Sequence, residues 1–347
     1  MLTPILLFAL GLVLLIKGGD WFVDSATGIA RRFHLPEILI GATVVSIGTT
    51  LPEVMVSAQG AIAGSGSMAY GNAVGSIICN TALIAALTIA IKPGKAERKS
   101  MIVPVCFFFG AVAFYMTVAY ATGCFSRPVG IILLSIFVIY MIVTVLQMKK
   151  NPTLAVTAGE EEEAESSLPD EEYARLTVTK KLLVHILGKR KSVAREIILL
   201  GVGAAVIALG ASLLVDNGTI IAHRVGVPES VIALTFVALG TSLPELVTAI
   251  ASIAKGHGSL SLGNIIGANL FNLVLVSGVA VTISPFSVPN ASRLFGHNAS
   301  LVMELPVMLS VMLILTVPAI IRQKLSRVQG IALLCIYAVF CTVQFVM

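Results

Sequence analysis

Ten long apolar runs limit what this sequence can fold into. They lie at about 4–30, 36–63, 69–91, 101–121, 126–147, 196–222, 228–254, 261–283, 299–321 and 327–346. Each is long enough to cross the hydrocarbon core of a bilayer as a helix, which takes roughly 20 residues. The runs are about twice the length of a barrel strand and lack its period-two alternation. The sequence therefore predicts an all-α polytopic membrane protein with ten transmembrane helices.

Composition supports this class, since 57% of the 347 residues are hydrophobic and only 12% are charged. The net charge of +5 does not indicate a nucleic-acid partner, because the basic residues lie in loops between apolar runs. The expected partner is the lipid bilayer. The N-terminus enters the first run without a basic region, which predicts a retained span and not a cleaved signal. The five cysteines show no CxxC spacing, which indicates free thiols and not a disulfide framework or a zinc site.

The basic residues also predict the orientation of the chain. The loops after the odd-numbered runs hold 19 lysines and arginines, whereas the other loops and the termini hold three. Basic loops remain on the cytoplasmic side. We therefore expect a multi-pass protein of the cell (inner) membrane with both termini outside.

The two halves of the sequence repeat each other. When residue n is aligned with residue n + 192, 15 of the 44 positions in 41–84 are identical to 233–276 without a gap. This predicts two five-helix repeats, 1–147 and 196–347, joined by an acidic cytoplasmic linker at 148–195. Because five spans is an odd number, the second repeat must be inverted relative to the first. Secondary transporters commonly have this architecture, with ion sites near the midplane.

The linker contains an acidic stretch at 159–165 and a second at 170–172. Its composition favours a solvated, mostly disordered segment. A regulatory cation-binding loop is the alternative, although the spacing of an EF-hand is absent.

The repeat carries its chemistry in Gly48-Thr-Thr-Leu-Pro-Glu53, which recurs as Gly240-Thr-Ser-Leu-Pro-Glu245. A charge near the bilayer centre costs roughly 2.5–3.5 kcal/mol, so paired carboxylates there indicate an ion or substrate path. Proline lacks an N–H, which frees a carbonyl of the preceding turn. Carboxylates, carbonyls and hydroxyls together form an all-oxygen site, which suits hard cations such as Ca²⁺, Na⁺ and Mg²⁺. Two ionised glutamates balance one Ca²⁺ or two Na⁺, and their repulsion in an empty site favours uptake of a proton.

Other residues in the runs indicate either helix packing or a place in the site. Gly71 and Gly75 share a helix face and predict close helix approach. Asn80 and Asn272 are buried amides that need partners, which favours a place in the site lining. Asp24 and Asp216 occupy equivalent places in the first and sixth runs. They are either interfacial residues at helix ends or participants in transport.

The paired motifs resemble the two alpha-repeats of the sodium/calcium exchanger branch of the cation/calcium antiporter superfamily. Residues 48–53 with 71–80 are similar to the first alpha-repeat, and residues 240–245 with 263–272 to the second. The resemblance covers essentially the whole chain. It implies a secondary antiporter, not an enzyme, that exchanges Ca²⁺ for Na⁺ by alternating access and needs no cofactor.

The resemblance also implies a ligand set. Glu53 and Glu245 would be shared cation ligands, and backbone oxygens of Thr49 and Thr241 would complete the Ca²⁺ site. The flanking Na⁺ sites would use Thr50, Ser76, Ser242 and the carbonyls of Ser46 and Ala238. Asn80 and Asn272 would line the centre. The first and sixth helices would slide against the other eight, and a monomer would suffice because one chain holds a complete site.

Two residues depart from the family pattern. Ala268 supplies no hydroxyl where the family often has serine, and Asn272 stands where potassium-dependent members carry aspartate. The second departure argues against potassium co-transport. A Ca²⁺/H⁺ exchanger on the same scaffold remains the main alternative. An intramembrane enzyme with two carboxylates and a passive channel are weaker ones.

Overall fold

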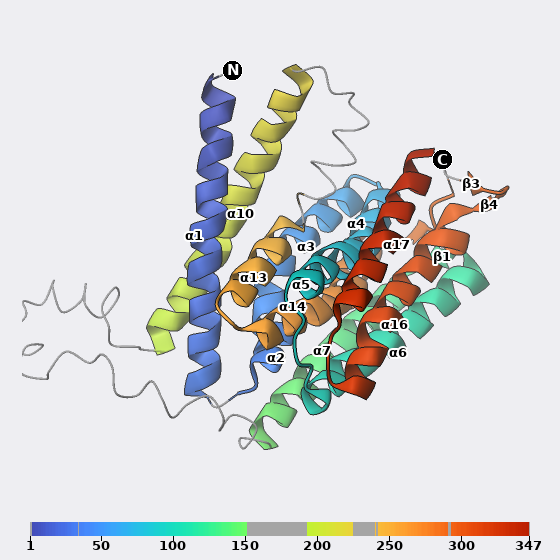
Figure 1. The fold of residues 1–347 in the computed structure, drawn as a ribbon. Helices are drawn as coiled ribbons and strands as arrows, with labels where there is room; N and C mark the ends of the chain where they lie inside the picture. Colours follow the sequence, from blue (N-terminus) through green and yellow to red (C-terminus); the bar gives the residue numbers. More distant parts are fainter. Residues whose placement is uncertain are drawn as a thin grey trace, which may run out of the picture.

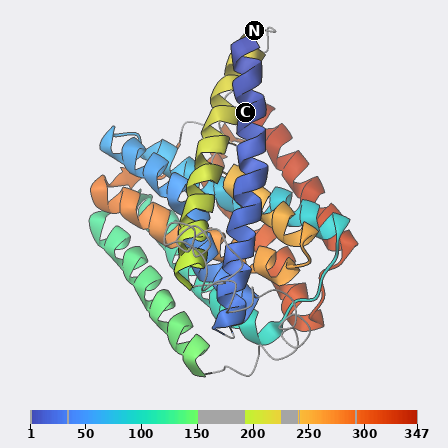
Figure 2. The ribbon, with the colours of Figure 1, turned by 90° about the vertical axis from the view of Figure 1, so that its left-hand side faces the viewer.

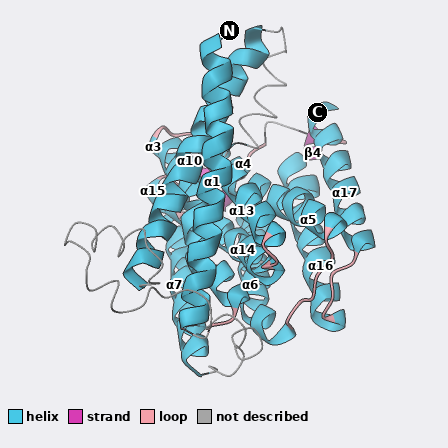
Figure 3. Cartoon of the chain, turned by 60° about the vertical axis from the view of Figure 1, so that its left-hand side comes forward, coloured by secondary structure: helices cyan, strands magenta, loops and turns pink. Residues whose placement is uncertain are grey.

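The structure is a computed structural model that describes residues 2–33, 35–150, 193–224, 240, 242–290 and 293–346. Helices make up almost all of the described chain (Figure 3). They are α1 (Leu2–Arg32), α2 (Glu37–Ile40), α3 (Ser46–Ile62), α4 (Gly66–Cys79), α5 (Ala86–Ile91), α6 (Arg98–Thr122), α7 (Arg127–Lys150), α10 (Val193–Arg224), α13 (Leu243–Ala254), α14 (Gly258–Phe271), α15 (Ser277–Ile283), α16 (Leu305–Arg322) and α17 (Arg327–Val346). Within these residues, π-helical turns join some of them: η1 (Gly41–Val45), η2 (Asn80–Ala85), η5 (Asn272–Val276) and η6 (Ser300–Glu304).

The predicted all-α membrane class is confirmed. Nine helical stretches in the described residues are long and apolar enough to cross a bilayer, and α13 is a shorter apolar helix. The run predicted at 228–254 is described only from 242 onward, so its first part lies outside the described residues. The linker predicted at 148–195 also falls mostly outside them, between the end of α7 and the start of α10. The two termini lie toward the same end of the molecule (Figure 1).

The helices α1 and α10 form a separate pair. They run side by side along one flank of the molecule and are tilted against the remaining helices (Figures 1 and 2). Glycines allow this close approach, because a Cβ at Gly203 would come within 2.9 Å of the Phe22 nitrogen. A Cβ at Gly210 would come equally close to the Gly11 carbonyl oxygen. The first helices of the two repeats therefore act as one packed unit.

The helix α14 forms the centre of the rest of the bundle. Its residues from Leu260 to Phe271 are all buried, and the span it begins is the most buried of the nine. A Cβ at Gly267 would lie 2.6 Å from the Ala42 Cα, so α14 and η1 pack backbone against backbone. The close approach predicted for Gly71 and Gly75 is thus observed at the residues 192 positions later. No described atom lies within 4 Å of a Cβ at Gly71 or Gly75, and the segment that would face them by the repeat lies outside the described residues.

Short strands pair the connecting segments at the ends of the bundle. The strand β1 (Cys124–Phe125) pairs antiparallel with β2 (Phe286–Ser287). An isolated antiparallel bridge joins Lys95 to Lys324. A small hairpin of β3 (Arg293–Leu294) and β4 (His297–Asn298) precedes η6. These contacts hold the helix ends in place and leave the helix interiors to form the site.

Candidate cation-binding site

The two motif glutamates are fully buried in the bundle. Glu53 lies on α3 directly after Pro52, which sits inside the helix, and its side chain is 0% exposed. Glu245 is equally buried but lies in the first turn of α13, where Pro244 is close to the helix start. The N-terminal end of a helix favours a negative charge. The aligned prolines thus occupy a helix interior in one half and a helix start in the other.

The first half also brings α1 against the site helix. A Cβ at Gly48 would come within 3.0 Å of the Phe22 ring, so this glycine lets the aromatic side chain of α1 pack directly on α3. Phe22 itself is buried. The glycine that opens the motif therefore has a packing role in addition to the local flexibility that the sequence indicates.

Buried polar side chains on the segments that carry the glutamates, and on the π-turns packed against α3 and α13, lack protein partners. Both carboxylate oxygens of Glu53 and of Glu245 make no hydrogen bond. The same is true of the Thr50 and Ser242 hydroxyls and of both amide atoms of Asn80 and Asn272. These six residues supply ten of the sixteen buried unpartnered side-chain atoms in the described chain. Buried polar groups are normally paired, so a cluster of oxygens without partners fits a bound cation.

The two halves of this cluster come close together. The carboxylates of Glu53 and Glu245 are near enough to interact electrostatically. The Thr49 hydroxyl lies beside the Glu245 carboxylate, which links α3 to the second repeat. Two carboxylates provide the charge that balances one divalent or two monovalent cations, and neutral oxygens can complete the coordination. No group of three or more His, Cys, Asp or Glu side chains is arranged to hold a metal in the described residues, so neutral oxygens must make up the rest of such a site.

The buried amides begin matching π-helical turns. Asn80 is the first residue of η2, and Asn272 is the first residue of η5. A π-turn widens the helix by one residue and leaves backbone carbonyls with altered pairing, and such turns are frequent at functional sites. The Ser277 hydroxyl donates to the Asn272 carbonyl oxygen at 3.2 Å, as expected for this irregular backbone. The same irregularity occurs in both repeats, and η2 packs against α13 while η5 packs against α3, the helices that carry the two glutamates.

The other predicted ligands have different surroundings. The Ser46 hydroxyl donates to the Gly41 carbonyl oxygen at 2.7 Å and also lies 3.0 Å from the Asn264 carbonyl oxygen. The Thr49 hydroxyl donates to Asn264 Oδ1 at 3.2 Å. Ser76 is buried. Ala238 and Thr241 lie outside the described residues. The hydroxyl hydrogens of Ser46 and Thr49 are thus donated to protein acceptors, and the ligand atoms expected from these two residues are their backbone oxygens.

Asn264 has a structural role that the sequence interpretation missed. Its Oδ1 accepts from Ser46 and Thr49, each at 3.2 Å, and its Nδ2 donates to the Thr248 hydroxyl at 3.0 Å. It therefore ties α14 both to α3 and to α13. Asn72, its equivalent in the first repeat, donates to the Glu53 carbonyl oxygen at 3.1 Å. The identity of these two asparagines across the repeat was the available signal.

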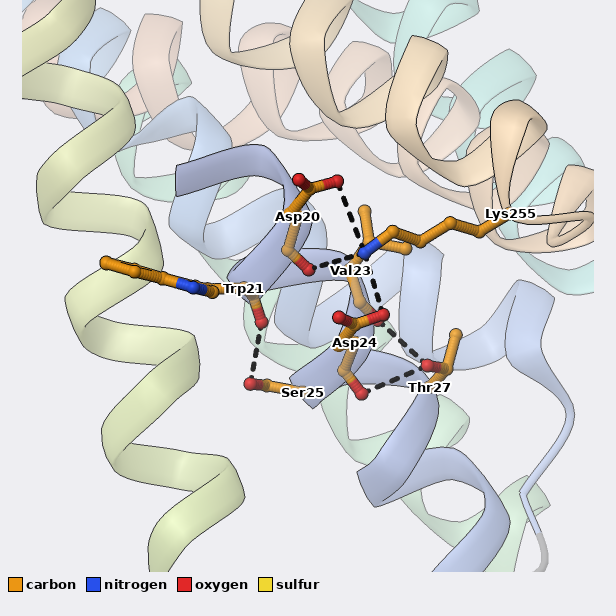
Figure 4. Close-up of polar contacts among 7 residues, drawn as sticks. All are labelled: Asp20, Trp21, Val23, Asp24, Ser25, Thr27 and Lys255. Atoms are coloured by element: carbon orange, nitrogen blue, oxygen red, sulfur yellow. Dashed lines mark hydrogen bonds and ion pairs between the residues drawn. The ribbon is translucent and has the colours of Figure 1, made fainter. Parts of the chain in front are cut away.

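Asp24 and Asp216 do not join the cluster. Lys255 bonds to Asp24 Oδ1 at 2.8 Å, lies 3.3 Å from Asp20 Oδ1 and donates to the Asp20 carbonyl oxygen at 3.0 Å (Figure 4). Asp216 accepts a hydrogen bond from Ser212 on its own helix at 3.0 Å. The structure therefore favours the interfacial interpretation of both aspartates, with Lys255 tying α1 to the end of α13.

Comparison with known proteins identifies the family. The family profile described as "Sodium/calcium exchanger protein" matches residues 3–146 and 195–346, which is most of the chain. The chain belongs to the sodium/calcium exchanger family. It is therefore a multi-pass membrane protein and a cation antiporter of the sodium/calcium exchanger type. It is a transporter and not an enzyme. The profile thus matches the chain twice, once in each half.

Individual relatives agree with the family. This exchanger is 30% identical to the sodium/calcium exchanger MaX1 of Methanosarcina acetivorans, over 98% of each chain. It is 35% identical to the inner membrane protein YrbG of Escherichia coli, over 82% of this chain and 81% of YrbG. Its structure superposes on the sodium-calcium exchanger NCX_Mj, soaked with 2.5 mM Na⁺ and 10 mM Sr²⁺, with a TM-score of 0.76, 30% identity and 97% of both chains covered.

Proposed function

We propose that this exchanger transports Ca²⁺ in exchange for Na⁺ by alternating access, with Glu53 and Glu245 as shared cation ligands. The observation that carries the proposal is the set of ten buried, unpartnered polar atoms on the two glutamates and on Thr50, Ser242, Asn80 and Asn272. The names of MaX1 and NCX_Mj, both sodium/calcium exchangers, support the choice of ions. A filled site neutralises two buried charges, whereas an empty one leaves them unpaired, which disfavours crossing without a cation.

Within this proposal the ligands have distinct roles. Thr50, Ser242, Asn80 and Asn272 surround the carboxylates with neutral oxygens, since their polar atoms have no protein partner. The backbone oxygens of Ser46, Thr49, Ala238 and Thr241 and the Ser76 hydroxyl complete the set. A single chain holds both glutamates, so a monomer suffices for transport. We further propose the orientation with both termini outside and the division into repeats 1–147 and 196–347 with a cytoplasmic linker at 148–195.

Flux in proteoliposomes tests the ion pair. Ca²⁺ uptake should follow an imposed outward Na⁺ gradient and should saturate with external Ca²⁺. Uptake that follows a pH gradient and is indifferent to Na⁺ contradicts the proposal and supports Ca²⁺/H⁺ exchange. One observation favours that alternative, because Ala268 brings no hydroxyl to the second repeat. Flux without a counter-ion on the opposite side would instead indicate a channel.

The orientation has its own test. In sealed right-side-out cell membranes or spheroplasts, a protease added outside should leave the 148–195 segment intact. The same protease added to inverted vesicles should cut the chain there into two halves. Cleavage from outside contradicts the proposed topology and leaves the transport proposal unaffected.

A further inference from the structure

The two ends of the bundle are built alike. The turn before α4 places Gly64 at φ 76°, and the turn before α14 places Gly256 at φ 84°. After α15, the Val288 nitrogen donates to the Gly123 carbonyl oxygen at 2.9 Å, and after α5, the Ala96 nitrogen donates to the Gln323 carbonyl oxygen at 3.0 Å. The connecting sequences are Ile283-Ser-Pro-Phe-Ser287 and Ile91-Lys-Pro-Gly-Lys95, which align in the 192-residue register.

An aromatic side chain closes the first of these ends. Phe286 packs on a small apolar cluster of Ala61, Ala69 and Ala280. Its ring lies 5.6 Å from that of Phe125, its partner in the β1–β2 pair. A Cβ at Gly66 would collide with the Phe286 side chain, so the ring fills the space between the start of α4 and the end of α15.

At the other end this ring is absent and a cavity takes its place. Gly94 aligns with Phe286 and has no side chain to insert. A cavity of about 270 Å³ lies there, between the end of α5, the start of α14 and Leu325. No described atom lies within 4 Å of a Cβ at Gly258, the residue that aligns with Gly66. The backbone at Gly94 has no positive φ, so nothing in its conformation requires glycine there.

The lining of the cavity combines positive charge with apolar surface. Lys92 and Lys95 line it, whereas serines occupy the aligned positions 284 and 287, and no acidic residue lines it. Among the described residues neither lysine forms an ion pair, and the Lys92 ammonium donates only to the Ile253 carbonyl oxygen, at 3.3 Å. The apolar wall consists of Ala85, Ile89, Ile253, Leu262, Ile265 and Leu325. Two lysines repel cations, so the cavity is not a branch of a cation path and suits an anion.

We propose that this cavity binds the phosphate headgroup of an anionic phospholipid. Basic pockets between transmembrane helices bind such headgroups. The surrounding surface suits lipid, because Ile91, Ile321 and Val328 flank the basic connecting segments in sequence and are 65%, 73% and 77% exposed. The phosphate lies against Lys92 and Lys95. The glycerol backbone contacts the apolar wall, in the space that the Phe286 ring fills at the opposite end of the bundle.

Native mass spectrometry of the purified full chain tests this site. The protein is titrated with phosphatidylglycerol and, separately, with zwitterionic phosphatidylcholine. One phosphatidylglycerol should bind tightly, and Lys92→Gln/Lys95→Gln should weaken that binding about twenty-five-fold, since each basic residue contributes roughly fivefold. Gly94→Phe, which copies the opposite end, should remove it. The matched control is Arg98→Gln. Arg98 is an exposed basic residue at the start of α6 that does not line the cavity, so this substitution should leave binding unchanged.

The outcomes separate the possibilities. Equal binding of phosphatidylglycerol to the wild type, the double-lysine variant and Gly94→Phe overturns the proposal. Tight binding of phosphatidylcholine in the same place overturns the role of the lysines. Displacement of the lipid by millimolar inorganic phosphate alone assigns the cavity to a soluble phosphate and overturns the lipid source. If Gly94→Phe does not fold, the double-lysine variant decides, because both of its substitutions are at exposed side chains.

Discussion

Replacing Glu53 by glutamine should have opposite effects on the empty and the filled protein. Both oxygens of Glu53 are buried and have no protein partner, and the Glu245 carboxylate lies nearby. In the absence of ions, the neutral amide removes a desolvated charge and its repulsion, so Glu53→Gln should raise the unfolding temperature. With Ca²⁺ present, the variant has lost one of two charged ligands. Removing one partner of a buried charge pair costs about 3–5 kcal/mol, which is a loss in affinity of roughly a hundredfold to several thousandfold.

Two measurements on purified protein check this pair of effects. Thermal unfolding is followed in ion-free buffer and over a Ca²⁺ titration, and Ca²⁺ uptake is measured in proteoliposomes. Wild type should gain about 2.7 kcal/mol at a Ca²⁺ concentration a hundred times its dissociation constant, and the variant should gain almost nothing at that concentration. The control is Glu97→Gln, because the Glu97 side chain is exposed, lies outside the site and accepts a hydrogen bond from the Ser100 hydroxyl at 3.0 Å. Wild-type Ca²⁺ affinity in Glu53→Gln would refute the assignment of this carboxylate as a ligand.

Three further substitutions probe the surroundings of the site. Asn264→Ala removes the buried amide that contacts three hydroxyls and ties α14 to α3 and α13, so it should cost about 1–3 kcal/mol in unfolding free energy and lower Ca²⁺ uptake; an unchanged melting temperature contradicts the proposed network. Gly267→Ala should destabilise the protein because its Cβ would meet the Ala42 backbone, whereas Gly110→Ala, on an exposed helix face, should be neutral or stabilising by roughly 0.5–1 kcal/mol. Asp24→Asn should change stability by about 0–1 kcal/mol and retain most transport, since its pair with Lys255 is largely exposed. If Asp24→Asn loses as much transport as Glu53→Gln, then Asp24 takes part in transport and the interfacial interpretation is wrong.

The sequence was sufficient to predict the spans and to single out polar residues that the structure shows to be buried. A bilayer offers the backbone no hydrogen bonds, so long apolar runs can only be helices. A buried carboxylate or amide in such a helix is expensive, so Glu53, Glu245, Asn80 and Asn272 could be selected as site residues by their cost alone. In the structure these four residues carry eight of the buried unpartnered atoms.

The sequence was less informative about neighbouring hydroxyls. Ser46 and Thr49 have the residue type of a ligand, yet both hydroxyls bond to atoms of Asn264 from the other repeat. The acceptor that the packed helices place beside a serine or threonine fixes the direction of its O–H, and with it the direction in which the oxygen lone pairs face. That placement is set by the contact of η1 with α14 and is not encoded in the local sequence.

The repeat shows most clearly what only the tertiary structure decided. The sequence by itself determined two five-helix units with a carboxylate motif in each, because the duplication is visible in identical residues. The fold then decided which of these residues meet. Asn264 reaches across to Ser46 and Thr49 of the other repeat, and Phe286 fills at one end of the bundle the space that Gly94 leaves open at the other. Side-chain identity specifies what a residue can bind, but the packing of distant segments determines which partner lies within reach.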